Sequence, residues 1–486
     1  MAGGQSLRGV DAVVVGAGPN GLAAAIELAR AGLKTVVLEQ AATVGGGCRS
    51  AELTLPGIVH DVCAAIMPLA VASPQLKDLD LGRYGLEWIT PPAALAHPFD
   101  DGSAAVVTSS TAETAASLDG VDAKAYSNLM EPVVRNWSSL AGDLLMPLHF
   151  PRHPVVLGRF GLRALLPAAT LARLVFRGSR ARALFAGLAA HSVLPFSAWA
   201  SASFGLVLAA LAHVAGWPLV RGGSQRLVDA MSACLRDRDG VIHLGTSVSS
   251  LDELSEAGLV LLDVSPRQLL AMSGDRLGSL TRRRLARFRY GPGVFKMDWA
   301  LGGPIPWKAK ACARAGTVHL GGSFEEIAQS ENAVAAGRLA DRPFVIVAQP
   351  SLFDSSRTGD ARHTGWAYCH VPSGSNADLT QAVEAQVERF APGFRSGILA
   401  RHARTAAAAE AENPNQVGGD VTGGLNSLGQ LFTRPLARLV PYAIGIEGVF
   451  LCSASTPPGG GVHGQCGFNA AAAALKSRRR RSADAG

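Results

Sequence analysis

The hydrophobic pattern of the first forty residues predicts a strand, a helix and a second strand. Residues 11–15 (DAVVV) are a short, mostly β-branched run, typical of a buried parallel strand. An Ala- and Leu-rich stretch follows, and Gly32 stands where the glycine that caps a helix C-terminus belongs. Residues 35–38 are a second apolar run, which ends at Glu39. This order predicts the start of a parallel α/β sheet.

Three glycines occupy the turn between the first strand and the helix. Gly16 permits the tight turn, Gly18 lets backbone N–H groups approach a pyrophosphate, and Gly21 lets the helix pack closely on the strand. Glu39 follows Gly21 by eighteen residues, where a carboxylate can accept hydrogen bonds from an adenosine ribose. Together these features predict a dinucleotide-binding site.

One long segment, residues 183–220, contains no Lys, Arg, Asp or Glu. Four interpretations are open: a buried helix, an apolar wall of a substrate site, a segment that dips into a membrane, and a membrane span. Pro195 and two histidines interrupt the segment, and its uninterrupted apolar core has the length of a buried helix. A buried helix or a substrate wall is therefore the main expectation.

Composition excludes several classes of protein. With 486 residues, 48% apolar and 17% charged, the chain is globular and long enough for two or three domains. The seven cysteines include no CxxC pair, which argues against a disulfide framework, a zinc ribbon and a dithiol enzyme. We therefore predict no metal site and a cytoplasmic, reduced environment.

The net charge of +7 is most concentrated in residues 476–482 (KSRRRRS). This run is either a solvated, frayed tail or a contact for anionic lipid or nucleic acid. Because no nucleic-acid motif accompanies it, we expect no nucleic-acid partner. A peripheral membrane contact and a homodimer both stay open.

Residues 43–50 (TVGGGCRS) resemble the second fingerprint of the glutathione-reductase-type FAD fold, in its amine-oxidase branch. The resemblance implies that Gly45 and Gly46 lie against the FAD pyrophosphate and that Arg49 supplies positive charge nearby. FAD, rather than NAD, is then the expected cofactor.

Further segments resemble the phytoene-desaturase-like group of FAD-dependent oxidoreductases, which includes the pyridine-nucleotide-disulfide-oxidoreductase-domain proteins. The similar segments are residues 56–74, 295–307, 365–374, 413–424 and 452–464. The likeness covers essentially the whole chain, although Met67 stands where this group is expected to carry a histidine. It implies that Val248 flanks the adenine and that the backbone around Gly460, Gly461 and Val462 faces the isoalloxazine ring. A helix beginning near residue 467 would then direct its positive end toward the reduced flavin.

The implied fold is α/β, with a glutathione-reductase-type Rossmann FAD-binding domain and a mixed-sheet substrate domain that carries a helical insertion. The expected FAD-binding parts are residues 1–75, 215–290 and 436–475. The expected substrate-domain parts are residues 76–214, which look helical, and 291–435. Residues 476–486 form the basic tail.

The resemblance implies a dehydrogenase or desaturase that transfers hydride to flavin N5 from an apolar isoprenoid-, lipid- or polyketide-like substrate. The alternatives are an oxidase of an amine or alcohol, a flavin-dependent isomerase, and a non-catalytic FAD protein. No second GxGxxG follows mid-chain, so O2, a quinone or another protein is the expected electron acceptor. His463 is the first candidate for the catalytic base and His60 the second, while Asp61, Tyr368 and His370 are further candidates by position.

Overall fold

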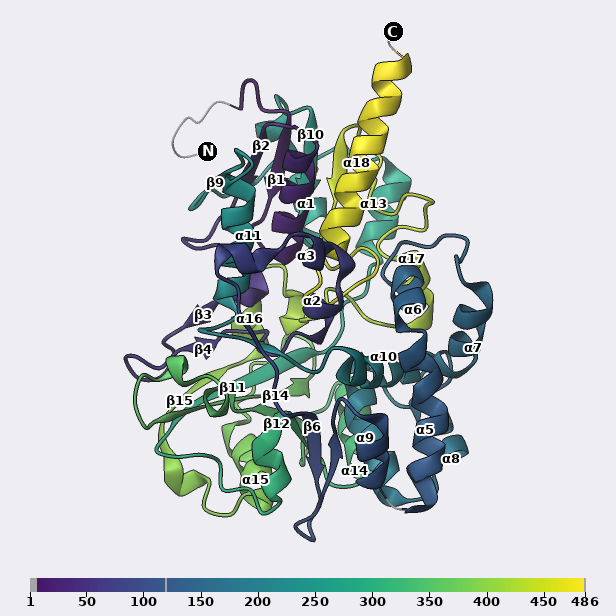
Figure 1. Cartoon of the computed structure of the whole chain (residues 1–486). Helices are drawn as coiled ribbons and strands as arrows, with labels where there is room; N and C mark the ends of the chain where they lie inside the picture. Colours follow the sequence, from purple (N-terminus) through teal and green to yellow (C-terminus); the bar gives the residue numbers. More distant parts are fainter. Residues whose placement is uncertain (1–6, 119, 485–486) are drawn as a thin grey trace.

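The computed structural model describes residues 7–118 and 120–484. Its strands form two large sheets, with a group of helices beside the second (Figure 1). The α/β fold class predicted from the sequence is confirmed. Four short strands form two small additional sheets: β3 (Ser50–Ala51) with β4 (His60–Asp61), and β5 (Trp88–Ile89) with β8 (Leu219–Val220).

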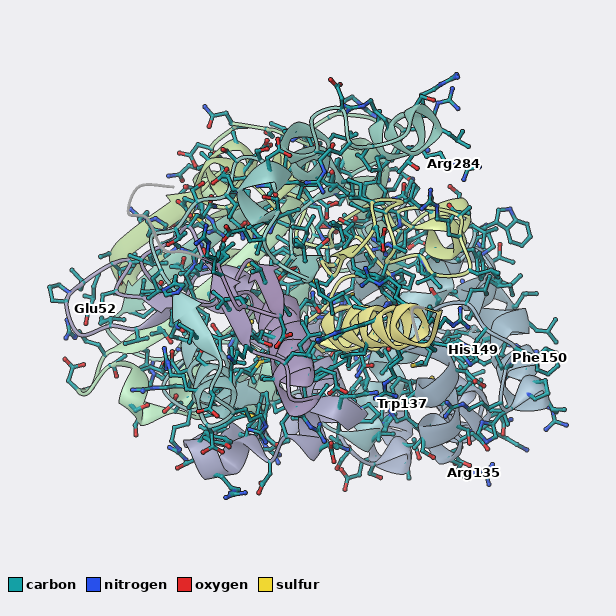
Figure 2. The ribbon with its side chains drawn as sticks, turned by 90° about the horizontal axis from the view of Figure 1, so that it is seen from above. Glu52, Arg135, Trp137, His149, Phe150 and Arg284 are labelled. Carbon is teal, nitrogen blue, oxygen red and sulfur yellow. The ribbon has the colours of Figure 1, made fainter. Side chains whose placement is uncertain are left out.

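The first sheet has five parallel strands in the order β16-β10-β1-β2-β9. These are β1 (Ala12–Val15), β2 (Thr35–Leu38), β9 (Val241–His243), β10 (Leu259–Leu262) and β16 (Val449–Leu451). Helix α1 (Pro19–Arg30) packs between α11 (Gln225–Arg236) and the C-terminal helix α18 (Gln465–Asp484). In Figures 1 and 2 the yellow α18 lies beside the purple N-terminal elements. Three distant parts of the chain thus build one sheet.

The second sheet has seven strands in the order β15-β11-β14-β13-β12-β6-β7. These are β6 (Ala93–Pro98), β7 (Ala104–Val107), β11 (Gly293–Leu301), β12 (Ala315–Leu320), β13 (Val345–Ala348), β14 (His363–Val371) and β15 (Ile398–Arg404). All neighbours are antiparallel except β12 and β6, so the sheet is mixed as predicted. Residues Phe295, Met297 and Trp299 of β11 pack with α15 (Thr380–Phe390) on one face. The alternate residues of β11 therefore point to the opposite face.

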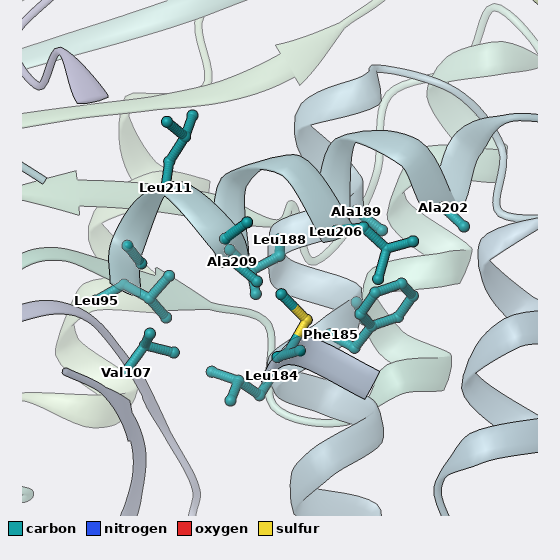
Figure 3. Packing of buried hydrophobic residues seen from close by; sticks show 14 of the residues in the cluster. Leu95, Val107, Leu184, Phe185, Leu188, Ala189, Ala202, Leu206, Ala209 and Leu211 are labelled. Atoms are coloured by element: carbon teal, nitrogen blue, oxygen red, sulfur yellow. The ribbon is translucent and has the colours of Figure 1, made fainter. Parts of the chain in front are cut away.

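Helices cover that opposite face. They are α4 (Thr111–Ala116), α5 (Gly120–Arg135), α6 (Trp137–Leu144), α7 (Pro154–Ala164), α8 (Ala168–Val175), α9 (Ser179–Ala189), α10 (Ser201–Val214) and α14 (Phe324–Ala335). Figure 3 shows Leu184, Phe185 and Leu188 of α9 meeting Leu206 and Ala209 of α10 in one buried cluster. The segment without charges therefore contains buried helices, as its length predicted.

Shorter helices complete the fold: α2 (Pro68–Ala72), α3 (Pro74–Asp78), α12 (Pro266–Met272), α13 (Ser279–Ala286), α16 (Ala406–Glu412) and α17 (Leu428–Thr433). Within the described ranges, no single helix is long and apolar enough to cross a membrane. Helices α7 and α8 reach that length and composition only as a pair, which is bent by 97°.

Two local expectations were wrong. Residues 93–107, expected to be helical, form the β6–β7 hairpin, because the Asp-Asp-Gly turn lets Phe99 N–H bond to the Ser103 carbonyl. The basic tail is helical as far as Asp484, because α18 contains no proline and only one early glycine to interrupt it.

Candidate cofactor and substrate site

A cavity of 530 Å³ lies between the two large sheets. At one end, which we call the dinucleotide end, it is lined by loops that follow β1, β2 and β10 and by residues 460–462. At the other, the aromatic end, it is lined by the inner face of the seven-stranded sheet and by α10. The lining residues of the aromatic end include His191, Phe204, Leu208, Trp217, Lys296, Thr317, Ile346, Trp366, Tyr368 and His370.

The glycine turn after β1 leaves the beginning of α1 open. Gly16 has a φ of +100°, and a Cβ on Gly21 would collide with the Gly16 carbonyl oxygen. Gly18, the N-cap of α1, has no side chain, and the first turn of the helix contains no acid, although the Asp263 carboxylate accepts the Gly21 N–H of that turn. Since Gly16 and Gly18 line the cavity, the positive end of α1 borders the space in which an anion would bind.

Glu39 follows β2 and lines the same end of the cavity. Its carboxylate accepts N–H bonds from Ala17 at 2.7 Å and Ala41 at 2.8 Å. These bonds hold the carboxylate in place, and each carboxylate oxygen keeps a further lone pair for a ribose hydroxyl.

A second glycine loop closes on the first. A Cβ on Gly46 would lie 3.2 Å from the Gly18 Cα, and Arg49 Nε donates to the Gly46 carbonyl at 3.1 Å. Gly46 and Arg49 line the cavity. Gly45 and Gly21 do not line the cavity themselves. Gly45 has a φ of +132° and leaves room for the Arg49 side chain, because a Cβ on Gly45 would lie 2.9 Å from the Arg49 Cγ.

The C-terminal loop forms the opposite wall. Gly460, Gly461 and Val462 line the cavity, and so does Val248. Gly461 has a φ of +121°, and a Cβ there would come within 2.6 Å of the Leu69 side chain. The backbone of this loop therefore reaches the cavity because it carries no side chain at that point.

The aromatic end is built by side chains on one face of the sheet. The strand register aligns Arg404, Lys296, Tyr368, Ile346 and His319 in one row across five strands. Lys296 is buried and forms an ion pair with Asp298, two residues along the same face of β11. The row thus changes from charged residues at one edge to apolar and aromatic residues at the other.

Two histidines of this end are held by buried contacts. The Nδ1 atom of His370 lies 2.9 Å from the carboxylate of Glu331, which projects from α14. The Nε2 atoms of His191 and His319 are 3.4 Å apart. Burial of His191, followed by the charge of His370, lowers the pKa of His191 to about 3. His191 is therefore neutral at physiological pH.

The comparisons with known proteins agree with this geometry. Residues 14–79 match the family model described as an NAD(P)-binding Rossmann-like domain. Over 95% of this chain and 92% of the relative, the sequence is 25% identical to the rat protein named pyridine nucleotide-disulfide oxidoreductase domain-containing protein 2. It is also 28% identical to one of the limonene dehydrogenase subunits of Castellaniella defragrans, over 29% of this chain and 26% of that one.

Solved structures share the fold over almost the whole chain. An oxidoreductase from Methanosarcina mazei has a TM-score of 0.66 at 14% identity, covering 96% of this chain and 100% of the other. A putrescine oxidase variant has a TM-score of 0.62 at 16% identity, covering 97% and 99%. The matched model supports the predicted dinucleotide-binding unit at the N-terminus, and the solved structures support the predicted overall fold.

Neither histidine proposed as the catalytic base lines the cavity. His463 is buried, with Nε2 3.1 Å from the Gly459 carbonyl and Nδ1 accepting the Gln465 N–H at 3.0 Å. Both ring nitrogens thus brace the loop itself. His60 is also buried and contacts Thr54 at 2.8 Å. The structure therefore corrects the expectation that these two side chains face a substrate.

Among the other positional candidates, Asp61 is buried in an ion pair with Arg357, while Tyr368 and His370 line the cavity. The expectation for the last two came only from their place in a strand-like run.

Sequence reasoning missed Asp263, at the carboxyl end of β10. Its Oδ2 accepts the Gly21 N–H at 2.9 Å, and the residue lines the dinucleotide end. Burial, assisted by the charge of Glu39, raises the pKa of Asp263 to about 7. The position directly after a buried strand of the first sheet was the available signal, because such ends border the ligand in parallel sheets.

Proposed function

We propose that this protein is an FAD-dependent oxidoreductase that dehydrogenates a small, largely apolar organic molecule. The observation that carries the proposal is a single cavity whose one end suits a dinucleotide and whose other end is aromatic and aliphatic. A bound cofactor and an apolar molecule would therefore meet inside one enclosed space.

The residues present fit FAD. Glu39 would hold the adenosine ribose, while the N-terminus of α1 and the Arg49 guanidinium would hold the pyrophosphate. The backbone of residues 460–462 would lie against the flavin ring. When bound, FAD supplies the capacity to accept a hydride from a substrate.

The rest of the chemistry belongs to the protein side chains at the aromatic end. Phe204 and Leu208 of α10, with Ile346 of β13, offer apolar contacts that orient a substrate and exclude water. The similarity to part of a limonene dehydrogenase supports an isoprenoid-like skeleton, with lipid- and polyketide-like molecules as neighbouring classes. O2, a quinone or a partner protein is the proposed electron acceptor.

Anaerobic flavin bleaching tests the proposal. The purified, yellow protein is mixed with monoterpenes, isoprenoid alcohols, fatty acids and amines, and the visible absorbance of the oxidised flavin is followed. We expect an apolar member of this panel to bleach the flavin, and Leu208→Gln to slow the bleaching at least tenfold. Leu399→Gln, at an exposed position on β15, is the matched control and should leave the rate unchanged. A protein that does not retain FAD, or bleaching by amines alone, would contradict the proposal.

We further propose that the helical region docks on an anionic lipid bilayer. Residues 144–228 contain nine arginines and no Asp or Glu. Eight large apolar side chains of this region are exposed: Leu148, Phe150, Val155, Leu162, Leu165, Leu174, Trp199 and Val214. In Figure 2, Phe150 projects from the edge of the molecule next to His149. A surface that combines exposed apolar groups with an excess of positive charge is complementary to anionic lipid.

This apolar–basic surface also has a connection to the cavity. On α7, Val155, Arg159 and Leu162 share one face, and α10 packs against both α7 and α8. Because α10 also lines the aromatic end through Phe204 and Leu208, the same helix contacts both the helices of this surface and the proposed substrate site.

Vesicle flotation tests the docking. We expect the protein to float with vesicles of phosphatidylcholine and phosphatidylserine, and to float less with phosphatidylcholine alone or at high salt. The double variant Leu162→Ser/Leu174→Ser should lose most of the binding, whereas Leu399→Ser should not. Equal flotation of the two variants, or a dimer in solution that the double variant abolishes, would contradict it.

A further inference from the structure

Strand β14 presents three side chains with polar ends to the cavity. Trp366, Tyr368 and His370 alternate along the strand, so they lie on one face, and all three line the aromatic end. Their rings are in contact: the centroids of Trp366 and Tyr368 are 5.3 Å apart, and those of Tyr368 and His370 are 5.8 Å apart. We call these three residues the β14 stripe.

Each residue of this stripe carries one polar atom that has no partner within the described part of the protein. Trp366 is buried, and its Nε1–H makes no hydrogen bond. The Tyr368 hydroxyl and the His370 Nε2 likewise have none among residues 7–118 and 120–484. A buried donor without an acceptor is costly, and phenylalanine would avoid that cost at position 366. The stripe is therefore built for something other than packing.

The chemistry of the stripe is directional. Trp366 can only donate, and Tyr368 can donate and accept. His370 donates through Nδ1 to Glu331, whose carboxylate oxygens lie 2.9 and 3.0 Å away, so Nε2 is the ring nitrogen left for a ligand: it accepts in the neutral ring and donates in the charged ring. Alternate residues of a strand lie about 7 Å apart. The cavity wall thus offers a donor, a group that can donate or accept, and an imidazole nitrogen in sequence.

The charges nearby select among ligands. The two buried cations of this face, Lys296 and Arg404, are already paired with Asp298 and Glu412, and Glu331 adds a negative charge behind His370. A carboxylate would meet that negative charge without a free cation. A ligand with an ammonium group cannot accept the Trp366 N–H, and a hydrocarbon ligand pairs with none of the three polar groups of the stripe. A hydroxyl or carbonyl oxygen pairs with Trp366 or Tyr368, and a hydroxyl, which can donate or accept, also pairs with His370 Nε2.

We propose that the β14 stripe binds a neutral oxygen function, a hydroxyl or a carbonyl, on an otherwise apolar substrate. The inference rests on the proposed function in one respect: the aromatic end is taken as the place where the substrate binds. It narrows the substrate from apolar molecules in general to apolar alcohols and ketones.

Binding of a matched ligand series tests the stripe without requiring turnover. Limonene, carveol and carvone share one carbon skeleton, and they differ in carrying no oxygen, a hydroxyl and a ketone. Isothermal titration calorimetry of the holoprotein should show carveol and carvone binding at least tenfold more tightly than limonene. Trp366→Phe should weaken binding of the oxygenated ligands about tenfold and leave limonene within twofold.

The cavity supplies a matched control. Trp217 also lines the aromatic end, but its Nε1–H already donates to the Leu208 carbonyl. Trp217→Phe should therefore change all three affinities together. Equal affinity for limonene and carveol, equal loss of all three ligands in Trp366→Phe, or no binding of any of the three would overturn the proposal. Flavin bleaching is a separate readout: a preference for carveol without bleaching would support the stripe and reject the oxidoreductase function.

Discussion

The two ends of the cavity are shaped by different parts of the protein. At the dinucleotide end, backbone and glycine do most of the shaping, and the polar side chains there have partners in the protein: Glu39 holds two N–H groups and Asp263 holds one. At the aromatic end, side chains of a strand face do the shaping, and the polar atoms of Trp366 and Tyr368 have no partner among the described residues. The first end is complete before a ligand arrives, whereas the second becomes complete only with one.

This difference has a thermodynamic consequence. Where polar groups are already paired, replacing one breaks a protein interaction and costs folding stability. Where they are unpaired, replacement removes a desolvated group with little loss to the protein and acts mainly on ligand affinity. Substitutions at the two ends should therefore separate into stability effects and affinity effects.

The largest expected effect is at Gly21, where the chain allows no side chain. In Gly21→Ala the new methyl would collide with the Gly16 carbonyl, so the turn and α1 must separate. We expect a loss of about 4 kcal/mol in the free energy of unfolding and at least 100-fold weaker FAD binding. Gly161→Ala, which adds the same methyl to α7 in open space, is the control for urea unfolding and flavin content. Retained FAD in Gly21→Ala would contradict the placement of the pyrophosphate.

The second effect is a pH dependence at Asp263. Because burial raises the pKa of this carboxyl to about 7, the folded protein binds its proton more tightly than the unfolded chain does. This stabilisation is present in full below about pH 4 and is lost as the pH rises through about 7, a change of about 4 kcal/mol. Glu39 is the charged neighbour that reinforces the shift.

Urea unfolding of the wild type and of Asp263→Asn between pH 4 and 8 isolates that contribution. Asparagine can still accept the Gly21 N–H, so the variant should lose the pH dependence and be the more stable protein at pH 8. FAD affinity should also fall with rising pH in the wild type, as negative charge develops near the pyrophosphate, and fall less in the variant. Parallel pH curves for the two proteins would show that Asp263 does not titrate in this range.

The two ends also differ in how far sequence predicts them. The dinucleotide end was largely predictable, because Gly16, Gly18 and Glu39 lie within one β-α-β unit whose spacing is fixed by local geometry. Two later parts of this end, Val248 and residues 460–462, could be predicted only from the resemblance to a family, because no local sequence pattern connects them with β1. The mixed sheet was predicted as a class, but not its strand order.

The aromatic end could not be assembled from sequence. Lys296, Tyr368 and Ile346 become neighbours only through the register of three separate strands. His463 illustrates the opposite error: a histidine in a glycine loop beside the cofactor suggested catalysis, although its two ring nitrogens bind the backbone of that loop. Hydrogen bonds of this kind depend on the folded loop and leave no pattern in the sequence.

His463 supplies the third prediction. In His463→Leu the Gln465 N–H loses its acceptor in a buried loop, so we expect a loss of about 1.5 kcal/mol in the free energy of unfolding. Flavin content should fall with this loosening, but the turnover of molecules that retain FAD should stay within threefold. If turnover falls more than 100-fold at unchanged stability, His463 is a catalytic base after all.

Tyr368→Phe is expected to change stability least, and it tests most directly whether the aromatic end differs from the dinucleotide end. The hydroxyl has no partner within the described residues, so its removal should change the free energy of unfolding by no more than about 0.5 kcal/mol in either direction. The same variant should lose about tenfold in affinity for carveol, because a hydrogen bond to the ligand disappears. Tyr368→Phe and His463→Leu are then compared by urea unfolding and by calorimetry. We expect the free energy of unfolding to fall in His463→Leu and the affinity for carveol to fall in Tyr368→Phe. A loss of stability in Tyr368→Phe as large as that in His463→Leu would mean that the hydroxyl is already bonded inside the protein, and the two ends would not differ in kind.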